Sequence, residues 1–232
     1  MMRLACVLAA CFGTIGAVAP GSAPVLDSQV VLNRYMQALA RAVPPKNVVF
    51  TYALSQAGPH NLDQTHVIYR SQTRQRDEVT VIDGAAVRPP AIRIISRSDR
   101  YTVTRLAPRT EQYVFLFLSA RKNGPHREYL YATSALHPSS FTVTQVAIDG
   151  TYFLPTLIRF TTRSNAASGS GTIAYARFSQ YWMPRLATVN AKIAGKPARE
   201  RIAWSAYRFP LSLPSSTFAQ PRPVALPTPS PF

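Results

Sequence analysis

The stretch VVFTYALS, residues 48–55, decides how this chain folds. Every second residue from Val48 to Leu54 is large and apolar, and a period of two predicts a β-strand with one buried face. The same alternation recurs as far as residue 209, with short turns between the repeats. Strands are therefore expected at 48–55, 65–71, 78–83, 91–97, 101–107, 113–119, 141–148, 151–162, 172–182, 185–193 and 200–209.

Short turns between neighbouring strands predict an antiparallel meander. The Asn-Gly pair at 123–124 and the Asp-Gly pair at 149–150 are favoured in hairpins, because their residues tolerate positive φ. Residues 98–100 are short enough to join their two flanking strands in a tight hairpin. Pro184 is expected at a corner between two strands or at a sheet edge, since proline cannot donate to the hydrogen-bond ladder.

One amphipathic helix is expected before the first strand. Asp27 can cap it, Val31, Tyr35 and Leu39 recur at helical spacing, and Pro44-Pro45 ends it. Open twisted sheets rarely exceed about ten strands, so the meander must curl, split or close. The predicted fold class is mainly β (α+β), with a large curved antiparallel sheet or incomplete β-barrel of about eleven strands packed over the N-terminal helix.

The chain divides into three parts. Residues 1–23 have an early base, an apolar run too short to span a bilayer and then small residues, which predicts a secretory signal peptide. Residues 24–218 are expected to form a single half-barrel domain, and the Pro-rich residues 219–232 a disordered tail. The protein is thus predicted to be periplasmic or secreted. Cys11 follows Leu-Ala-Ala and is a lipidation candidate, which would anchor the protein to a membrane.

The composition is strongly basic, with 26 Lys and Arg against 10 Asp and Glu and a net charge of +16. Such a charge suits an anionic membrane surface or an acidic envelope protein. The alternative is that the bases are ordinary solvated surface residues without a partner-binding role. This alternative is supported by their scatter along the chain, since a basic binding patch would be gathered in one run. No nucleic-acid partner is expected.

The sequence contains no recognisable catalytic motif. The four histidines lie in separate predicted turns or strand starts without metal-ligand spacing, and no phosphate-binding glycine loop occurs. Both cysteines lie in the predicted signal peptide, so the mature domain has no thiolate. We therefore predict a protein that is not an enzyme, with no catalytic residues, no metal site and no cofactor.

Aromatic side chains are abundant at alternating strand positions. Each is individually best explained as core, but one short helix cannot cover the inner face of eleven curved strands. An uncovered apolar groove on a secreted protein usually marks a ligand or partner site. The groove candidates are Phe50, Tyr52, Tyr69, Phe115, Phe117, Phe160 and Trp182.

The order of motifs in the C-terminal half resembles a known family. Leu154-Pro155 leads into TLIRF, a glycine-rich hairpin follows, and an aromatic strand ends at Trp182-Met183-Pro184 before RLATVNAKIAGKPARERIAWSAYRFPLSLPSSTF. This order is similar to that in the periplasmic lipoprotein carriers and outer-membrane lipoprotein-sorting relatives, the LolA/LolB-like superfamily. The helix, VVFTYALS and RQRDEVTVIDG extend the resemblance over roughly residues 26–218.

The resemblance implies a half-open barrel with a helical lid that holds acyl chains of lipids or lipoproteins. It also implies an arginine near the cavity mouth that latches the lid, for which Arg70, Arg74 and Arg76 are candidates. The favoured function is therefore an extracytoplasmic carrier or binder. The alternative is an envelope-stress sensor or scaffold of the same fold that binds a partner protein, and an enzyme or nucleic-acid binder is a third, weaker reading.

Overall fold

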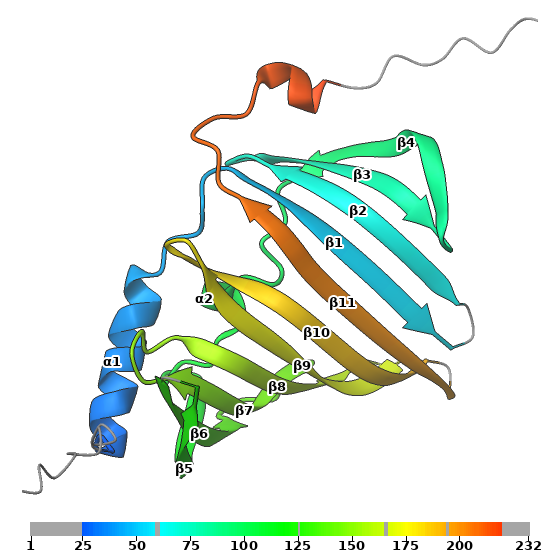
Figure 1. The fold of residues 1–232 in the computed structure, drawn as a ribbon. Coiled ribbons are helices and arrows are strands. Elements are labelled where there is room, and N and C mark those ends of the chain that lie inside the picture. The colour runs from blue at the N-terminus through cyan, green and yellow to red at the C-terminus, as the bar shows by residue number, and fades with distance from the viewer. Residues whose placement is uncertain (1–24, 59–60, 125, 165–166, 194, 220–232) are drawn as a thin grey trace, which may run out of the picture.

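The computed structural model describes residues 25–58, 61–124, 126–164, 167–193 and 195–219 (Figure 1). The predicted signal peptide, Cys11 and nearly all of the predicted Pro-rich tail lie outside these residues. The helices and strands are, in chain order, α1 (Ser28–Arg41), β1 (Val48–Ala57), β2 (Leu62–Arg70), β3 (Arg74–Ile82), β4 (Ala85–Ser96), α2 (Val103–Leu106), β5 (Tyr113–Asn123), β6 (His126–Ala135), β7 (Phe141–Asp149), β8 (Pro155–Arg163), β9 (Ala167–Phe178), β10 (Tyr181–Ile193), β11 (Lys196–Arg208) and the 3-10 helix η1 (Ser215–Phe218).

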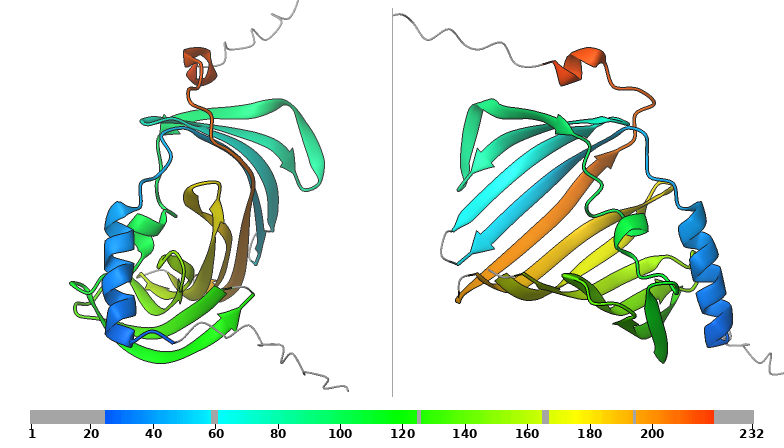
Figure 2. Two further views of the ribbon diagram at one scale, coloured as in Figure 1. Left: turned by 60° about the vertical axis from the view of Figure 1, so that its left-hand side comes forward. Right: turned by 180° about the vertical axis from the view of Figure 1, so that it is seen from behind.

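The strands form one antiparallel sheet of eleven strands in the order β4-β3-β2-β1-β11-β10-β9-β8-β7-β6-β5. The first and last strands of this order do not pair, so the sheet stays open. Figure 2 shows it bent into a half-barrel, with α1 across the open side and the segment carrying α2 between α1 and the sheet. The predicted fold class, a curved incomplete barrel over an N-terminal helix, is confirmed.

Helix α1 begins where the sequence predicted. The Asp27 carboxylate accepts hydrogen bonds from the backbone N–H groups of Gln29 and Val30 and so caps the first turn. Beyond the cap, Val31, Leu32, Tyr35 and Leu39 are buried on one face of the helix.

That buried face of α1 packs against the concave side of the sheet. Two tyrosines of β6 fix its N-terminal end, because the Tyr131 hydroxyl donates to the Ser28 carbonyl and the Tyr129 hydroxyl accepts from the Leu26 N–H. The core under the helix continues along the inner face of the sheet through Val143, Val146, Ile148, Ile158, Ile173, Ala187 and Ile202. One row of this face pairs Ile158 with Ile173 and Ala187 with Ile202 across neighbouring strands, which is why these strands alternate so strictly.

The predicted strand at 101–107 and its hairpin at 98–100 were wrong. Residues 97–112 leave β4 at one edge of the sheet and must reach β5 at the other edge, so the chain crosses the concave face instead of pairing beside β4. In crossing it forms the short helix α2, which buries Val103, and then buries Ala107 and Pro108. Alternation alone could not reveal the crossing, because an apolar residue that is buried inside the half-barrel looks the same in the sequence as one on the buried face of a strand.

Pro184 does not mark the corner between two strands. It lies within β10, and the corner between β9 and β10 comes earlier, at Ser179, whose φ is +56°. Pro184 pairs with Tyr175 of β9, whereas pairing with β11 begins only at Leu186, so its position has the one-sided pairing expected of an edge. The pairing of β10 with β9 shifts register between Pro184 and Leu186. A β-bulge tolerates proline because the ladder is already interrupted there.

The C-terminal residues cover the opposite face of the β2–β3 region. Phe218 is buried, η1 contacts β3, and the Arg76 guanidinium donates to the Thr217 carbonyl at 3.1 Å. Tyr69 is the cross-strand partner of Arg76 and shares its face. This outer packing stabilises the wall of the half-barrel without entering its interior.

Two buried tyrosine hydroxyls provide a test of how the crossing segment is held. The Tyr35 hydroxyl of α1 donates to the Pro108 carbonyl at 2.7 Å, both groups being buried, whereas the Tyr175 hydroxyl has no hydrogen-bond partner among the described residues. We expect Tyr35→Phe to lower the free energy of unfolding by about 1–3 kcal/mol, because it leaves a buried carbonyl unpaired. Tyr175→Phe is the matched control and should be neutral or stabilising, since it removes an unpaired buried hydroxyl. Urea denaturation followed by circular dichroism measures both, and equal losses would contradict the assignment.

Candidate ligand-binding site

Two adjoining cavities lie between the concave face and the elements that cover it. The first, which we call the helix-side cavity, has a volume of about 350 Å³. The C-terminal end of α1 with the residues after it, the crossing segment and β10 enclose it. Its apolar wall consists of Ala38, Val43, Val48, Val103, Leu154, Tyr181, Trp182 and Met183, and Arg41, Arg97 and Arg177 also line it.

The second, which we call the sheet-side cavity, has a volume of about 280 Å³ and lies over the β1–β4 half of the sheet. Aromatic side chains dominate its wall: Phe50, Tyr52, Tyr101, Trp204 and Tyr207. Arg70, Thr102, Met183 and Pro184 line both cavities, so the two meet at these residues. With its volume of about 350 Å³ and its mainly apolar wall, the helix-side cavity has the size and character typical of small-molecule sites.

The crossing segment that closes both cavities is anchored by Arg97. Its Nε donates to both oxygens of Asp99, at 2.8 and 3.1 Å, and its Nη1 donates to the carbonyls of Pro45, Lys46 and Ser71. One guanidinium therefore ties together the start of the crossing segment, the α1–β1 connection and the β2–β3 turn. Sequence reasoning missed this residue, although its position two residues before Asp99 was a visible signal.

Arg70 lies at the junction of the two cavities, with its side chain 14% exposed. Its Nε donates to the Gln75 side-chain oxygen at 3.0 Å, and its guanidinium carbon lies 5.2 Å from the centre of the Phe50 ring. Burial lowers the pKa of the Arg70 guanidinium to about 10; Asp99 opposes the shift and Arg97 adds to it. The group therefore stays charged at neutral pH inside a mostly apolar space.

A polar cluster is built into the β2–β4 side of the sheet-side cavity. Asp77 Oδ1 lies 2.6 Å from His66 Nδ1, and Asp77 Oδ2 accepts from Arg93 at 3.0 Å. Burial alone raises the pKa of the Asp77 carboxyl, but the hydrogen bonds and charges of His66 and Arg93 outweigh it and hold that pKa below its ordinary value. The cluster holds β2, β3 and β4 in register at the cavity wall.

Three of the predicted groove aromatics line these cavities. Phe50 and Tyr52 face the sheet-side cavity from β1, although Phe50 is itself almost fully buried. Trp182 faces the helix-side cavity from β10. Its indole N–H donates to the Pro155 carbonyl at 2.6 Å, so the polar edge of the ring is satisfied and its apolar face is left for the cavity.

The other four predicted aromatics lie outside the cavities. Phe115 and Phe117 pack edge-on against Tyr131 on the β5–β6 side, and Phe160 stacks on Phe141 with ring centres 4.8 Å apart. Tyr69 faces the opposite side of β2, as described above.

Of the three latch candidates, only Arg70 enters the interior. Arg74 is exposed at the β2–β3 turn, and Arg76 faces outward, where it pairs with Glu78 at 2.5 Å. Tyr101 and Met183 are cavity residues that the sequence analysis did not select. Tyr101 lies on the segment that was predicted to be a strand, and only the crossing of this segment places it at the sheet-side cavity.

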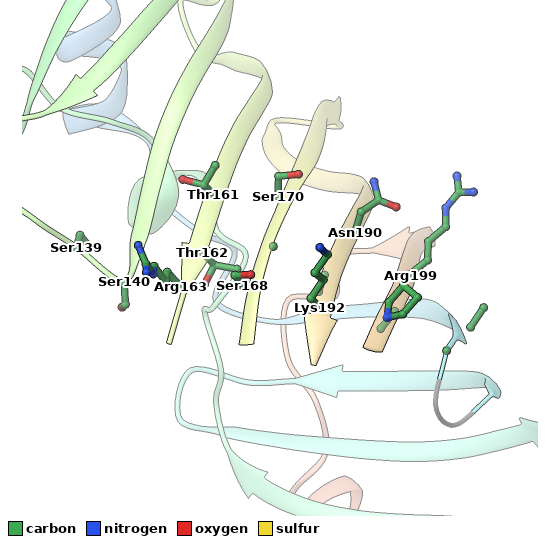
Figure 3. Close-up of a pocket in the computed structure, with 16 residues that line it drawn as sticks. Ser139, Ser140, Thr161, Thr162, Arg163, Ser168, Ser170, Asn190, Lys192 and Arg199 are labelled. Carbon is green, nitrogen blue, oxygen red and sulfur yellow. The ribbon is translucent and has the colours of Figure 1, made fainter. Parts of the chain in front are cut away.

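A third, wider cleft lies at the far end of the strands, around the β8–β9 and β10–β11 hairpins. Its volume is about 920 Å³, and Figure 3 shows the side chains that line it. Hydroxyl groups are frequent among them, and three bases, Arg163, Lys192 and Arg199, join them. No acidic residue is among the described residues that line the cleft, and none of the three bases forms an ion pair within the described ranges.

Among the residues that the structure describes, no group of three or more His, Cys, Asp or Glu side chains could hold a metal ion. In the same residues, no helix has both the length and the apolar composition needed to cross a bilayer.

Comparison with known proteins gives structural likeness only. No protein-family profile matches the sequence, and no curated protein matches it significantly. The chain is similar to the crystal structure of a LolA superfamily protein from Nitrosomonas europaea, at 14% identity and a TM-score of 0.41, covering 84% of this chain and 99% of that one. It is also similar to a domain from Vibrio parahaemolyticus named for outer membrane lipoprotein sorting, at 14% identity and a TM-score of 0.45, covering 83% of this chain and 97% of that one.

A weaker likeness is to the MucA/MucB complex of Pseudomonas aeruginosa, at 11% identity and a TM-score of 0.25, covering 81% of this chain and all of that one. The first two names belong to the superfamily that the order of motifs resembles. Because all three TM-scores lie below 0.5, function has to be inferred from the residues of this chain.

The Asp77 cluster predicts a pH-dependent contribution to stability. A carboxyl whose pKa is lowered in the folded state stabilises above its unfolded pKa, about 3.9, and this contribution is lost as the pH falls through the folded value. We expect Asp77→Asn to lower the free energy of unfolding by about 1–3 kcal/mol at pH 7, with the difference from wild type closing below about pH 4. Urea denaturation at several pH values measures it. Glu111→Gln, at an exposed turn, is the control, and a gap that stays constant with pH would contradict the role of Asp77.

Proposed function

We propose that this protein is an extracytoplasmic binding or carrier protein that holds an acyl chain of a lipid or lipoprotein between its half-barrel and α1. The observation that carries this proposal is the helix-side cavity, about 350 Å³ in volume, whose wall includes Leu154, Trp182 and Met183. The sheet-side cavity continues the same space past Arg70, Thr102, Met183 and Pro184. A flexible apolar chain suits two small connected cavities better than a rigid ligand does, because it can follow the bend between them.

The covering elements supply the means of entry. Arg97 anchors the start of the crossing segment, and the hydrogen bond from Tyr35 to Pro108 attaches the segment to α1. Neither attachment is one of the hydrogen bonds between strands. Release of the crossing segment would open both cavities without breaking a strand pair. We assign export to the N-terminal signal-like residues, so the site would meet its ligand in the periplasm or outside the cell.

A second candidate function, binding of a partner protein as an envelope sensor or scaffold, is favoured by one feature. Strand β5 is a sheet edge, and its Val114, Leu116 and Leu118 side chains are 56%, 65% and 46% exposed. Exposed apolar edge strands are sites of strand addition. A protein purified from a bacterial periplasm that shows a bare mass by native mass spectrometry, with no acyl species on lipid extraction, would favour this candidate over the carrier.

Filling the helix-side cavity tests the carrier proposal. Ala38 lines this cavity, whereas Ala40 lies on the exposed side of the same helix. We expect Ala38→Trp to weaken binding of a fluorescent fatty acid by about tenfold or more, because each excluded CH₂ forfeits ~0.8 kcal/mol. Ala40→Trp adds the same side chain outside the cavity and should bind like wild type. Equal affinities of the two variants, both folded by circular dichroism, would refute this site.

We further propose that the third cleft contacts anionic headgroups when the protein delivers or collects its ligand. Its three bases, which form no ion pair among the described residues, support this role, since each base near an anionic surface contributes about 1 kcal/mol. The triple variant Arg163→Gln, Lys192→Gln, Arg199→Gln should lose about a hundredfold in partitioning onto phosphatidylglycerol vesicles, with no change on neutral vesicles.

The control for this experiment removes the same charge elsewhere. Arg88, Arg105 and Lys122 are exposed bases that do not line the cleft, and their triple Gln variant has the same net charge as the cleft variant. If both triple variants lose partitioning equally, only the overall charge matters and the cleft is not the docking site.

A further inference from the structure

The interior of the half-barrel contains more positive than negative charge. Arg70 and Arg97 both face the Asp99 carboxylate, but only Arg97 donates hydrogen bonds to it, at 2.8 and 3.1 Å. The nearest approach of Arg70 to the same carboxylate is 3.9 Å, from Nη1 to Oδ1. One carboxylate thus serves two guanidiniums, and Arg70 is the one with the weaker pairing.

Among the residues that the structure describes, no acid other than Asp99 compensates Arg70. Gln75, which accepts from its Nε, is neutral, and Asp77 is already engaged by His66 and Arg93. The remaining charged side chains that line the two cavities are Arg41 and Arg177 on the helix side and Arg100 on the sheet side, and all three are bases. Within the described residues, the two cavities therefore hold one positive charge in their interior without a counter-ion of its own.

Such a charge is unfavourable in the empty protein. A guanidinium removed from water loses hydration that only a nearby anion or several hydrogen bonds restore. Its stacking over Phe50 and its bond to Gln75 restore part of this. Because the charge persists at neutral pH, an anionic group placed beside Arg70 gains both the ion pair and relief of this cost.

We propose that the ligand is an acyl amphiphile with an oxyanion head, a carboxylate or a phosphate, that pairs with Arg70 while its chain fills the helix-side cavity. This inference rests on the proposed function and specifies which end of the ligand is recognised and where. The position fits such a molecule, since Arg70 lines both cavities and the apolar walls of Val48, Val103 and Met183 begin beside it. The guanidinium can bind either oxyanion through two parallel hydrogen bonds.

The test compares three probes with the same chain length: laurate, monododecyl phosphate and methyl laurate, which lacks the charge. Affinities come from displacement of a fluorescent fatty acid. Wild type should bind at least one of the two anions about 10- to 100-fold more tightly than the ester, the range expected for a hydrogen bond to a charged group. The anion that binds more tightly identifies the head as carboxylate or phosphate.

Three variants locate the effect. Arg70→Met keeps the long apolar stem but not the charge, so it should bind all three probes alike, whereas Arg70→Lys should retain a preference for the anions. Arg74→Met removes the same charge from the exposed turn four residues away and should keep the wild-type preference. Circular dichroism checks folding, and the comparison of probes on wild type needs no variant at all.

The outcomes separate this inference from the proposed function. If wild type binds the ester as tightly as both anions, or if Arg70→Met keeps the preference, the pairing with Arg70 is overturned while the acyl cavity stands. If wild type binds none of the three probes, the acyl-binding function itself fails, and this inference fails with it.

Discussion

The structure depends on covering the apolar inner face of a sheet that cannot close. Strands β4 and β5 are consecutive in the chain, yet they lie at opposite edges of the sheet, so residues 97–112 must cross its concave side. That crossing and α1 form the cover, and they are joined by the buried hydrogen bond from Tyr35 to Pro108. Every other feature of the interior, including its cavities, follows from how much of the face these two elements reach.

The cover is smaller than the face beneath it. Helix α1 occupies the region of β6 through Tyr129 and Tyr131, and α2 inserts only a few buried residues near β10. The inner side of β1–β4 is left with aromatic side chains and the Asp77 cluster facing the sheet-side cavity. A half-barrel with a small cover therefore has room for a ligand.

Charge and closure are linked in the same few residues. Arg97 anchors the crossing segment through Asp99 and three backbone carbonyls, and by engaging Asp99 it leaves Arg70 short of a counter-ion. The residue that closes the cavity thus also sets the charge that an occupant meets. An anionic ligand that pairs with Arg70 would take no hydrogen-bond partner away from Arg97. Ligand binding at Arg70 is therefore compatible with a crossing segment that stays anchored by Arg97. This is why we place recognition at Arg70 and anchoring at Arg97.

Elements that follow a local rule were predictable from neighbouring residues alone. Asp27 caps α1 because its carboxylate accepts hydrogen bonds from free backbone N–H groups of the first turn, and alternation identified most strands because one face of each is buried. From these the open, curved sheet over one helix was predictable. The choice of Arg70 as an interior base rested on the resemblance together with Arg74 and Arg76, and nothing local separated the three.

Which residues meet depends on contacts between distant parts of the chain, and these became visible only in the folded protein. The fold turned the expected strand at 101–107 into a covering segment, placed Tyr69 on the outer face, and brought Arg70 and Arg97 to one carboxylate. Alternation shows that a strand has two different faces, but it does not show which face is concave. It also does not reveal a segment that crosses the concave side of the sheet. Those outcomes depend on contacts between residues far apart in the chain, which the periodicity of neighbouring residues does not encode.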